Sequence, residues 1–267
     1  MRLESAGNPR LKLVRRLARD RRLRHQRGLV LVEGVQLARD ALAAGLGVEL
    51  AVLAPEMWGE EARGLAAGLP ADRVVEVSPS LFRQLSDVES PQGVALLVRM
   101  PAPWDGRSGS ADHPLLVVDR LQDPGNLGTL LRAAEGLGCR AALLLEGTVD
   151  VWNPKVVRSA MGAAFRLPLR WGVERERLLA ETVAQGWRLL VAMPRGGRPL
   201  WETPLLGPVA VVVGNEAGGV SEEIRRRAEA VTIPMEGGES LNAAVAGAMI
   251  LYEAARQRAA IQRKAML

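Results

Sequence analysis

The chain has 267 residues, of which 48% are hydrophobic and 24% charged, a composition typical of a globular protein with its own core and not of a disordered chain. One cysteine and two histidines exclude a disulfide framework and the usual cysteine–histidine zinc sites, so we expect no metal. No apolar run approaches the ~20 residues of a membrane span, and the N-terminus lacks the apolar core of a signal peptide. These features predict a cytoplasmic protein without a membrane partner.

Positive charge is concentrated at the N-terminus. Residues 1–27 carry a net charge of +8, whereas the whole chain carries +5. Residues 9–27 predict a helix, with Asn8 as its N-cap and Pro9 at its first position. Apolar residues along this helix form a narrow stripe that would dock it on its own domain. The arginines therefore either bind an anionic partner or are simply solvated.

The first hundred residues alternate between strand-like and helix-like segments, which predicts a small α/β domain over residues 1–99. Residues 100–114 are rich in proline, glycine and small polar residues and have no apolar period, which predicts a linker. The expected strands of the first domain are 28–33, 48–53, 74–77 and 93–99, and the expected helices are 35–44, 57–67 and a short one from residue 78.

The strands expected after the linker have a more continuous apolar pattern than those before it. Near-continuous apolar runs are typical of strands covered on both faces, so residues 115–267 predict an α/β domain with a mostly parallel sheet. The expected strands are 115–118, 141–145, 187–193, 209–213 and a short one at 231–233. The expected helices are 127–137, 154–164, 174–185, 221–227 and 241–263.

Three polar segments lie at strand ends in this second region. In the first, a strand ending at Val118 leads through a Pro-Gly turn into a helix, with Asn126 near the helix start and Arg132 six residues later. A long cation at that position can reach back over the helix N-terminus, which can itself hold an anion. Each residue also has an ordinary interpretation, as a helix cap or as a solvated charge.

The second segment is the glycine-rich turn 214–219, which begins with a Gly-Asn-Glu triplet directly after a strand. Its glycines would let a ligand approach the backbone closely. The third segment runs from Ile233 to a Ser-Leu-Asn triplet at 240–242, where a helix rich in alanine and glycine begins. Ligands of open α/β sheets bind at this strand edge. Neither a Walker lysine nor a GxGxxG pattern follows a strand here, so a dinucleotide fold is poorly supported.

In this order, the three segments resemble the three motifs of the SpoU/TrmH family of RNA ribose 2′-O-methyltransferases. The similarity includes the six-residue spacing from Asn126 to Arg132 and an Asn-Pro-Lys segment at 153–162, in which Ser159-Ala160 stands where Ala-Ser is common. Residues 8–39 resemble the start of the substrate-binding domain, similar to ribosomal protein L30e, that precedes the catalytic domain in ribosomal-RNA members.

The resemblance implies a methyltransferase domain of the α/β-knot class, with a deep trefoil knot, after an L30e-like RNA-binding domain. It also implies a homodimer through the knotted domain, and S-adenosyl-L-methionine (AdoMet) as methyl donor between the second and third motifs. The implied cofactor contacts are Gly214, Ile233, Met235 and Leu241. The implied catalytic residues are Arg132, Asn126, Glu216, Ser240 and Asn242. Arg132 would act either as the base for a ribose 2′-hydroxyl or as a charge that positions a phosphate or oxyanion.

The implied substrate is RNA, with 23S ribosomal RNA expected because a separate domain precedes the catalytic one. The candidate phosphate ligands on the N-terminal helix are Arg10, Lys12, Arg15, Arg16, Arg19 and Arg22. Two nearer alternatives are a transfer-RNA 2′-O-methyltransferase and a resistance-type ribosomal RNA methyltransferase. An alternative of a different class is a non-catalytic RNA-binding protein of ribosome assembly, which the complete set of polar motif residues disfavours.

Overall fold

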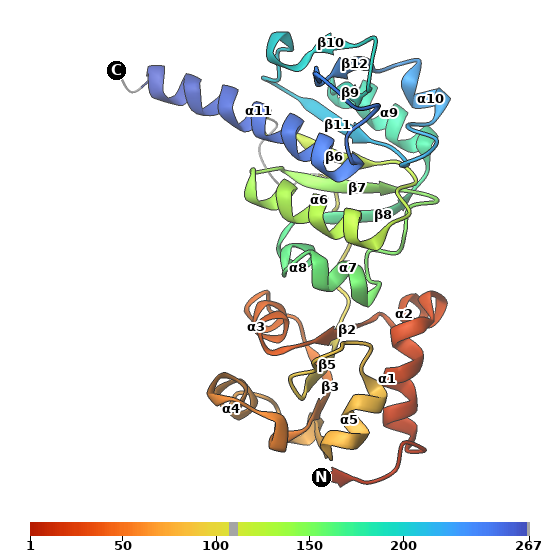
Figure 1. Cartoon of the computed structure of the whole chain (residues 1–267), viewed down its shortest axis with the longest axis vertical. Helices are drawn as coiled ribbons and strands as arrows, with labels where there is room; N and C mark the ends of the chain where they lie inside the picture. The colour runs from red at the N-terminus through yellow and green to blue at the C-terminus, as the bar shows by residue number, and fades with distance from the viewer. Residues whose placement is uncertain (107–111, 266–267) are drawn as a thin grey trace. The chain divides into compact units, whose positions relative to one another are not determined.

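The computed structural model describes residues 1–106 and 112–265, which form two compact units (Figure 1). One unit comprises Met1–Ala102 and Trp152–Phe165, and the other comprises Pro103–Val151 and Arg166–Leu267. Part of the predicted linker 100–114, residues 107–111, lies outside the described residues. Among the described helices, none is both long and apolar enough to cross a membrane.

The N-terminal unit is built on a five-stranded sheet in the order β1-β4-β3-β5-β2. Strand β5 runs antiparallel to its neighbours β2 and β3, and the other pairs are parallel. The strands are β1 Arg2–Leu3, β2 Leu29–Glu33, β3 Val48–Leu53, β4 Val74–Val77 and β5 Val94–Arg99. The helices are α1 Pro9–Arg19, α2 Arg21–Arg27, α3 Val35–Ala43, α4 Glu60–Ala67 and α5 Pro79–Leu85, with short 3-10 turns at Pro55–Met57 and Ala71–Arg73.

The prediction of one helix over residues 9–27 is wrong, because Asp20 divides it into two helices. Asp20 leaves the helical conformation with φ −103° and ψ 99°, and its Oδ1 accepts the backbone N–H of Leu23 at 2.9 Å. An aspartate N-cap of this kind satisfies one free donor of the second helix and so starts α2. The apolar stripe of α1 is buried in the core of the unit, as the sequence predicts.

The basic residues of α1 and α2 separate into two kinds. Arg24 is only 2% exposed, and its guanidinium donates to the carbonyl oxygens of Leu17 at 2.6 Å and Ala18 at 3.3 Å. It thereby satisfies acceptors that the C-terminal turn of α1 leaves free. The six candidate phosphate ligands are all exposed: Arg10, Lys12, Arg15, Arg16, Arg19 and Arg22.

The C-terminal unit is built on a seven-stranded sheet in the order β10-β12-β9-β11-β6-β7-β8, in which every pairing is parallel. This sheet confirms the predicted α/β class. The strands are β6 Leu115–Val118, β7 Ala141–Leu145, β8 Leu169–Val173, β9 Arg188–Ala192, β10 Arg198–Pro199, β11 Val209–Val213 and β12 Glu229–Thr232. The helices are α6 Pro124–Gly136, α9 Arg175–Gln185, α10 Glu222–Arg225 and α11 Ala243–Ala265, with a 3-10 turn at Leu200–Glu202.

The small residues of α11 allow this helix to pack closely. Helices α6 and α11 lie side by side over the sheet, and α11 also contacts β11 (Figure 1). A Cβ atom at Gly247 would come within 2.7 Å of Leu130 Cδ1 and 2.8 Å of Val213 Cγ2. A larger side chain at this position would therefore push α11 away from the strand that leads into the second motif.

Residues 103–106 of the predicted linker belong to the C-terminal unit and are fixed to it. Trp104 is buried, and its backbone N–H donates to the carbonyl oxygen of Leu169 at 2.7 Å. The guanidinium of Arg140 lies over the indole of Trp104, 5.3 Å from its ring centroid. It also lies over the ring of Trp187, 5.6 Å from that centroid. These contacts tie the chain that enters β6 to the core of this unit.

Residues 152–165, between β7 and β8, pack with the N-terminal unit. They form α7 Pro154–Ser159, which contacts β2, and α8 Ala163–Arg166. The single helix predicted over 154–164 is interrupted where Met161 and Gly162 take positive φ values of 49° and 80°. The Ser159 hydroxyl donates to the backbone carbonyl of Lys155 at 2.8 Å, so this serine closes the last turn of α7.

We expect Arg24→Ala to lower the free energy of unfolding by about 2 kcal/mol, because it removes a buried charge-assisted hydrogen bond and leaves helix-end carbonyls unsatisfied. Arg22→Ala, two residues earlier in the basic run and exposed, is the matched control and should change stability by less than about 0.5 kcal/mol. Urea denaturation followed by circular dichroism measures both. Equal stability of the two variants would contradict a structural role for Arg24.

Candidate active site

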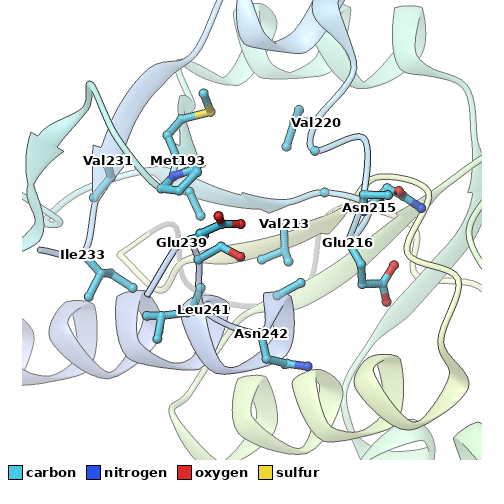
Figure 2. A pocket seen from close by; sticks show the side chains of 18 of the residues that line it. Met193, Val213, Asn215, Glu216, Val220, Val231, Ile233, Glu239, Leu241 and Asn242 are labelled. Atoms are coloured by element: carbon cyan, nitrogen blue, oxygen red, sulfur yellow. Dashed lines mark hydrogen bonds between the residues drawn. The ribbon is translucent and has the colours of Figure 1, made fainter. Parts of the chain in front are cut away.

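The second and third motifs line one cavity of about 580 Å³ at the carboxyl edge of the parallel sheet (Figure 2). All four predicted cofactor ligands line this cavity: Gly214, Ile233, Met235 and Leu241. Three of the predicted catalytic residues line it as well: Glu216, Ser240 and Asn242. Sequence reasoning missed the contribution of Ala192, Met193 and Pro194 at the end of β9, because these residues carry no polar signal.

The loop after β11 is closed on itself by hydrogen bonds of Asn215. The backbones of Asn215 and Gly219 exchange two hydrogen bonds of 3.0 and 2.9 Å, and Asn215 Oδ1 accepts the N–H groups of Ala217 and Gly218. Only glycine fits before it, since a Cβ atom on Gly214 would lie 2.3 Å from the carbonyl carbon of Gly219. The loop therefore presents a rigid backbone to the cavity.

A chain of hydrogen bonds joins the three motifs through their side chains. The Asn126 Nδ2 group donates to Glu216 Oε1 at 3.0 Å, and Asn242 Nδ2 donates to Asn126 Oδ1 at 3.0 Å. Asn242 Oδ1 in turn accepts the backbone N–H of Ala244 at 2.9 Å and so caps α11. The network brings together three of the five predicted catalytic residues.

Glu216 is held as an anion in this network. Burial opposes its ionisation, but the hydrogen bond from Asn126 and the backbone N–H groups of Gln122 and Asp123 outweigh burial and lower the pKa of Glu216. A carboxylate that accepts three such bonds acts as an anchor for the first motif. It is poorly suited to take a further proton at neutral pH.

The other two predicted catalytic residues stay outside this network. Arg132 is exposed on α6, two turns after the helix start, and makes no hydrogen bond or ion pair within the described part of the chain. Ser240 is exposed at the cavity wall, again without a hydrogen bond among the described residues. Both side chains can therefore meet a substrate without first breaking a protein contact.

Within residues 1–106 and 112–265, no three His, Cys, Asp or Glu side chains are grouped closely enough to hold a metal ion. The single cysteine, Cys139, is free. The polar groups at the cavity are amides, hydroxyls and carboxylates on backbone loops. This arrangement can bind a neutral or cationic organic ligand and can orient a hydroxyl group beside it.

Comparison with known proteins matches both units. Residues 113–252 match the SpoU rRNA methylase family, and residues 8–96 match the MRM3-like substrate binding domain. An uncharacterized tRNA/rRNA methyltransferase of Synechocystis sp. is 36% identical, over 96% of this chain and 94% of that protein. The 23S rRNA (guanosine(2553)-2′-O)-methyltransferase RlmP of Bacillus subtilis is 32% identical, over 94% of this chain and 97% of that protein.

A solved structure supports the same relationship. The SpoU methyltransferase AviRb of Streptomyces viridochromogenes, in complex with the cofactor AdoMet, superposes with a TM-score of 0.85 and 30% identity, over 94% of this chain and 98% of that chain. The family expected from the three motifs is thus confirmed, and the match covers both the motif-bearing unit and the N-terminal unit. The chain belongs to the SpoU rRNA methylase family.

Proposed function

We propose that the protein transfers the methyl group of AdoMet to a ribose 2′-hydroxyl of 23S ribosomal RNA. The observation that carries the proposal is the cavity of about 580 Å³ walled by the second and third motifs, with the Glu216–Asn126–Asn242 network at its rim. The volume lies in the range of small-molecule and cofactor sites. The ribosomal RNA relatives match this chain along nearly its whole length.

The residues of the cavity fit AdoMet. Gly214 lets the loop backbone close on Gly219 at the cavity wall, while Ile233, Met235 and Leu241 supply apolar surface. When bound, AdoMet supplies an electrophilic methyl group on a sulfonium. The protein must then hold the ribose in line with that methyl group and assist loss of the hydroxyl proton.

Arg132 is the residue that we assign to the substrate side. Its guanidinium is exposed, so we propose that it acts as a positive charge on a substrate phosphate or on the developing oxyanion. Asn126 and Asn242 would orient the ribose through the amide hydrogens that the network leaves unused, and Ser240 would add a hydroxyl contact. Glu216 would fix the position of Asn126.

One face of helix α11 is apolar and exposed. Helix α11 exposes Val245, Met249 and Tyr252, which recur at helical spacing on one face and are 46%, 44% and 61% exposed. This face supports a homodimer through the C-terminal unit. We further propose that the segment from β12 to α11 forms the trefoil knot of the family, and that the protein acts in the cytoplasm.

Alternative substrates are less well supported. A transfer-RNA enzyme would have no evident use for the N-terminal unit, which matches a substrate-binding domain and exposes eight basic residues on α1 and α2, among them the six candidate phosphate ligands. A non-catalytic role in ribosome assembly would leave the closed motif network without a purpose, because that network orients polar groups at a cofactor-sized cavity.

We expect Gly214→Ala to weaken AdoMet binding about tenfold or more, because the added Cβ atom must displace the backbone of Gly219. Gly218→Ala is the matched control in the same loop, since its Cβ atom would meet only Asn215 Oδ1 at an ordinary 3.7 Å. Isothermal titration calorimetry measures both variants, with NAD as a ligand that should not bind. Tight NAD binding without AdoMet binding would contradict the proposed cofactor.

The function is tested by methyl transfer from labelled AdoMet to 23S ribosomal RNA taken from a strain that lacks this protein. We expect one ribose 2′-O-methyl group per RNA, and a loss of rate on the order of 10²–10³ in Arg132→Ala with AdoMet affinity unchanged. Arg132→Lys should retain part of the rate, because lysine keeps the charge without the planar fork. Methylation of a base, or full activity of Arg132→Ala, would refute the assignment.

The exposed arginines of α1 and α2 should govern RNA affinity and not chemistry. A variant with Arg15, Arg16, Arg19 and Arg22 changed to Gln keeps the buried stripe of α1. Each lost phosphate contact should flatten the slope of log affinity against log salt by about 0.7–0.9, while AdoMet affinity stays unchanged. Filter binding at several salt concentrations measures this slope. A slope equal to that of the wild type would mean that these side chains are only solvated.

A further inference from the structure

A second cavity, of about 450 Å³, lies at the same edge of the parallel sheet and carries none of the functions assigned above. It shares Val220 with the cofactor cavity, so the two cavities lie on either side of the loop that follows β11. Its lining includes three arginines from three different segments: Arg120, Arg175 and Arg225. The lining also includes two carboxylates, Glu222 and Glu223.

Arg120 occupies a backbone conformation that favours glycine or asparagine. Its φ is 59°, in the left-handed region that is unfavourable for a long side chain. Three hydrogen bonds hold it there: its N–H donates to Thr148 Oγ1 at 3.0 Å, and its carbonyl accepts from Asn215 Nδ2 at 3.0 Å and Gln122 Nε2 at 2.9 Å. A strained residue that the surrounding structure holds so firmly points to a function for its side chain.

One buried carboxylate anchors two of the guanidinium groups. Asp119 is fully buried, and its Oδ2 accepts the backbone N–H of Ser221 at 2.6 Å. Its Oδ1 lies 3.3 Å from Arg120 Nε and 3.8 Å from Arg175 Nε. Each arginine approaches Asp119 through its Nε, and neither guanidinium makes a hydrogen bond within the described residues. Asp119 thus sets one negative charge against these two positive charges. Of the two carboxylates in the lining, Glu222 pairs with Arg225 and Arg226, and Glu223 adds one further negative charge.

The hydroxyl of Ser221 is a second, independent observation that points to a ligand at this cavity. The residue is 6% exposed and lines the cavity, yet its hydroxyl has no hydrogen-bond partner among the described residues. A buried polar group without a partner is unfavourable and rare in native proteins. The third arginine, Arg225, is neutralised in place, because its Nε donates to Glu222 Oε2 at 2.9 Å.

We propose that Arg120 and Arg175 bind a backbone phosphate of the RNA substrate, with the Ser221 hydroxyl as a further donor. This proposal rests on the proposed function for RNA as the source of the phosphate. Free terminal nitrogens on a fixed guanidinium match the bidentate geometry of phosphate, which favours arginine over lysine here. A phosphate held beside Val220 would fix the RNA one loop away from the cofactor, at a distance set by the protein backbone.

The first test compares Arg175→Gln with Arg177→Gln in the full-length protein, using an in vitro transcript of 23S ribosomal RNA. Arg177 lies on the same helix and is exposed, but its Nε is paired with Glu181 at 2.9 Å. We expect Arg175→Gln to weaken RNA binding on the order of tenfold and to flatten the salt slope by about 0.7–0.9, with AdoMet affinity unchanged. An equal effect of both substitutions, or no effect of Arg175→Gln, would overturn the proposal.

The second test needs no RNA and uses inorganic phosphate as the probe. In an NMR titration of arginine Nε–H groups, phosphate should shift Arg120 and Arg175 saturably and leave Arg177 unmoved, and Ser221→Ala should weaken the response. Absence of these shifts overturns the site even if methyl transfer is intact. If the protein binds phosphate here but does not methylate RNA, the proposed function is contradicted and the phosphate site stands. If it binds phosphate here but Arg175→Gln leaves RNA affinity unchanged, RNA is not the ligand of this site.

Discussion

The side-chain amide of Asn126 holds together the polar residues of the candidate active site through its hydrogen bonds to two other motifs. It bonds to residues that lie 90 and 116 positions further along the chain. An amide is required because this position must donate to the Glu216 carboxylate on one side and accept from Asn242 on the other, and a carboxylate could not do both. The bonds form because the parallel sheet brings the carboxyl ends of its strands to one edge.

Much of this arrangement could be predicted from the sequence, because apolar runs located the central strands and the polar motifs follow them directly. Two contributions could not be predicted in the same way. Strand β8 contains Arg170 and Gly172 and sits at the sheet edge, so it lacks the continuous apolar run of its neighbours. The cavity wall at Ala192–Pro194 is built from residues whose composition says nothing about ligands.

Charge alone also gave an incomplete account of the arginines. In the N-terminal run, Arg24 looks like its neighbours, but the helix break at Asp20 turns it toward the end of α1 and buries it. Near the site, Arg132 and Arg120 also differ. Arg132 makes no hydrogen bond or ion pair within the described chain, whereas the backbone of Arg120 is strained and is held by hydrogen bonds. Local backbone geometry therefore decides whether an arginine is buried as a structural group, as Arg24 is, or remains exposed to a ligand, as Arg132 is.

The packing of residues 152–165 with the N-terminal unit makes that unit discontinuous in sequence. A ribosome that has released residues 1–102 has not yet made α7, which covers β2, or the fully buried Trp152. The N-terminal unit must therefore wait for about sixty further residues before its contacts are complete. For the same reason, cutting the chain once in the proline-rich segment would leave an N-terminal fragment that lacks α7, so a single cut does not separate the two units.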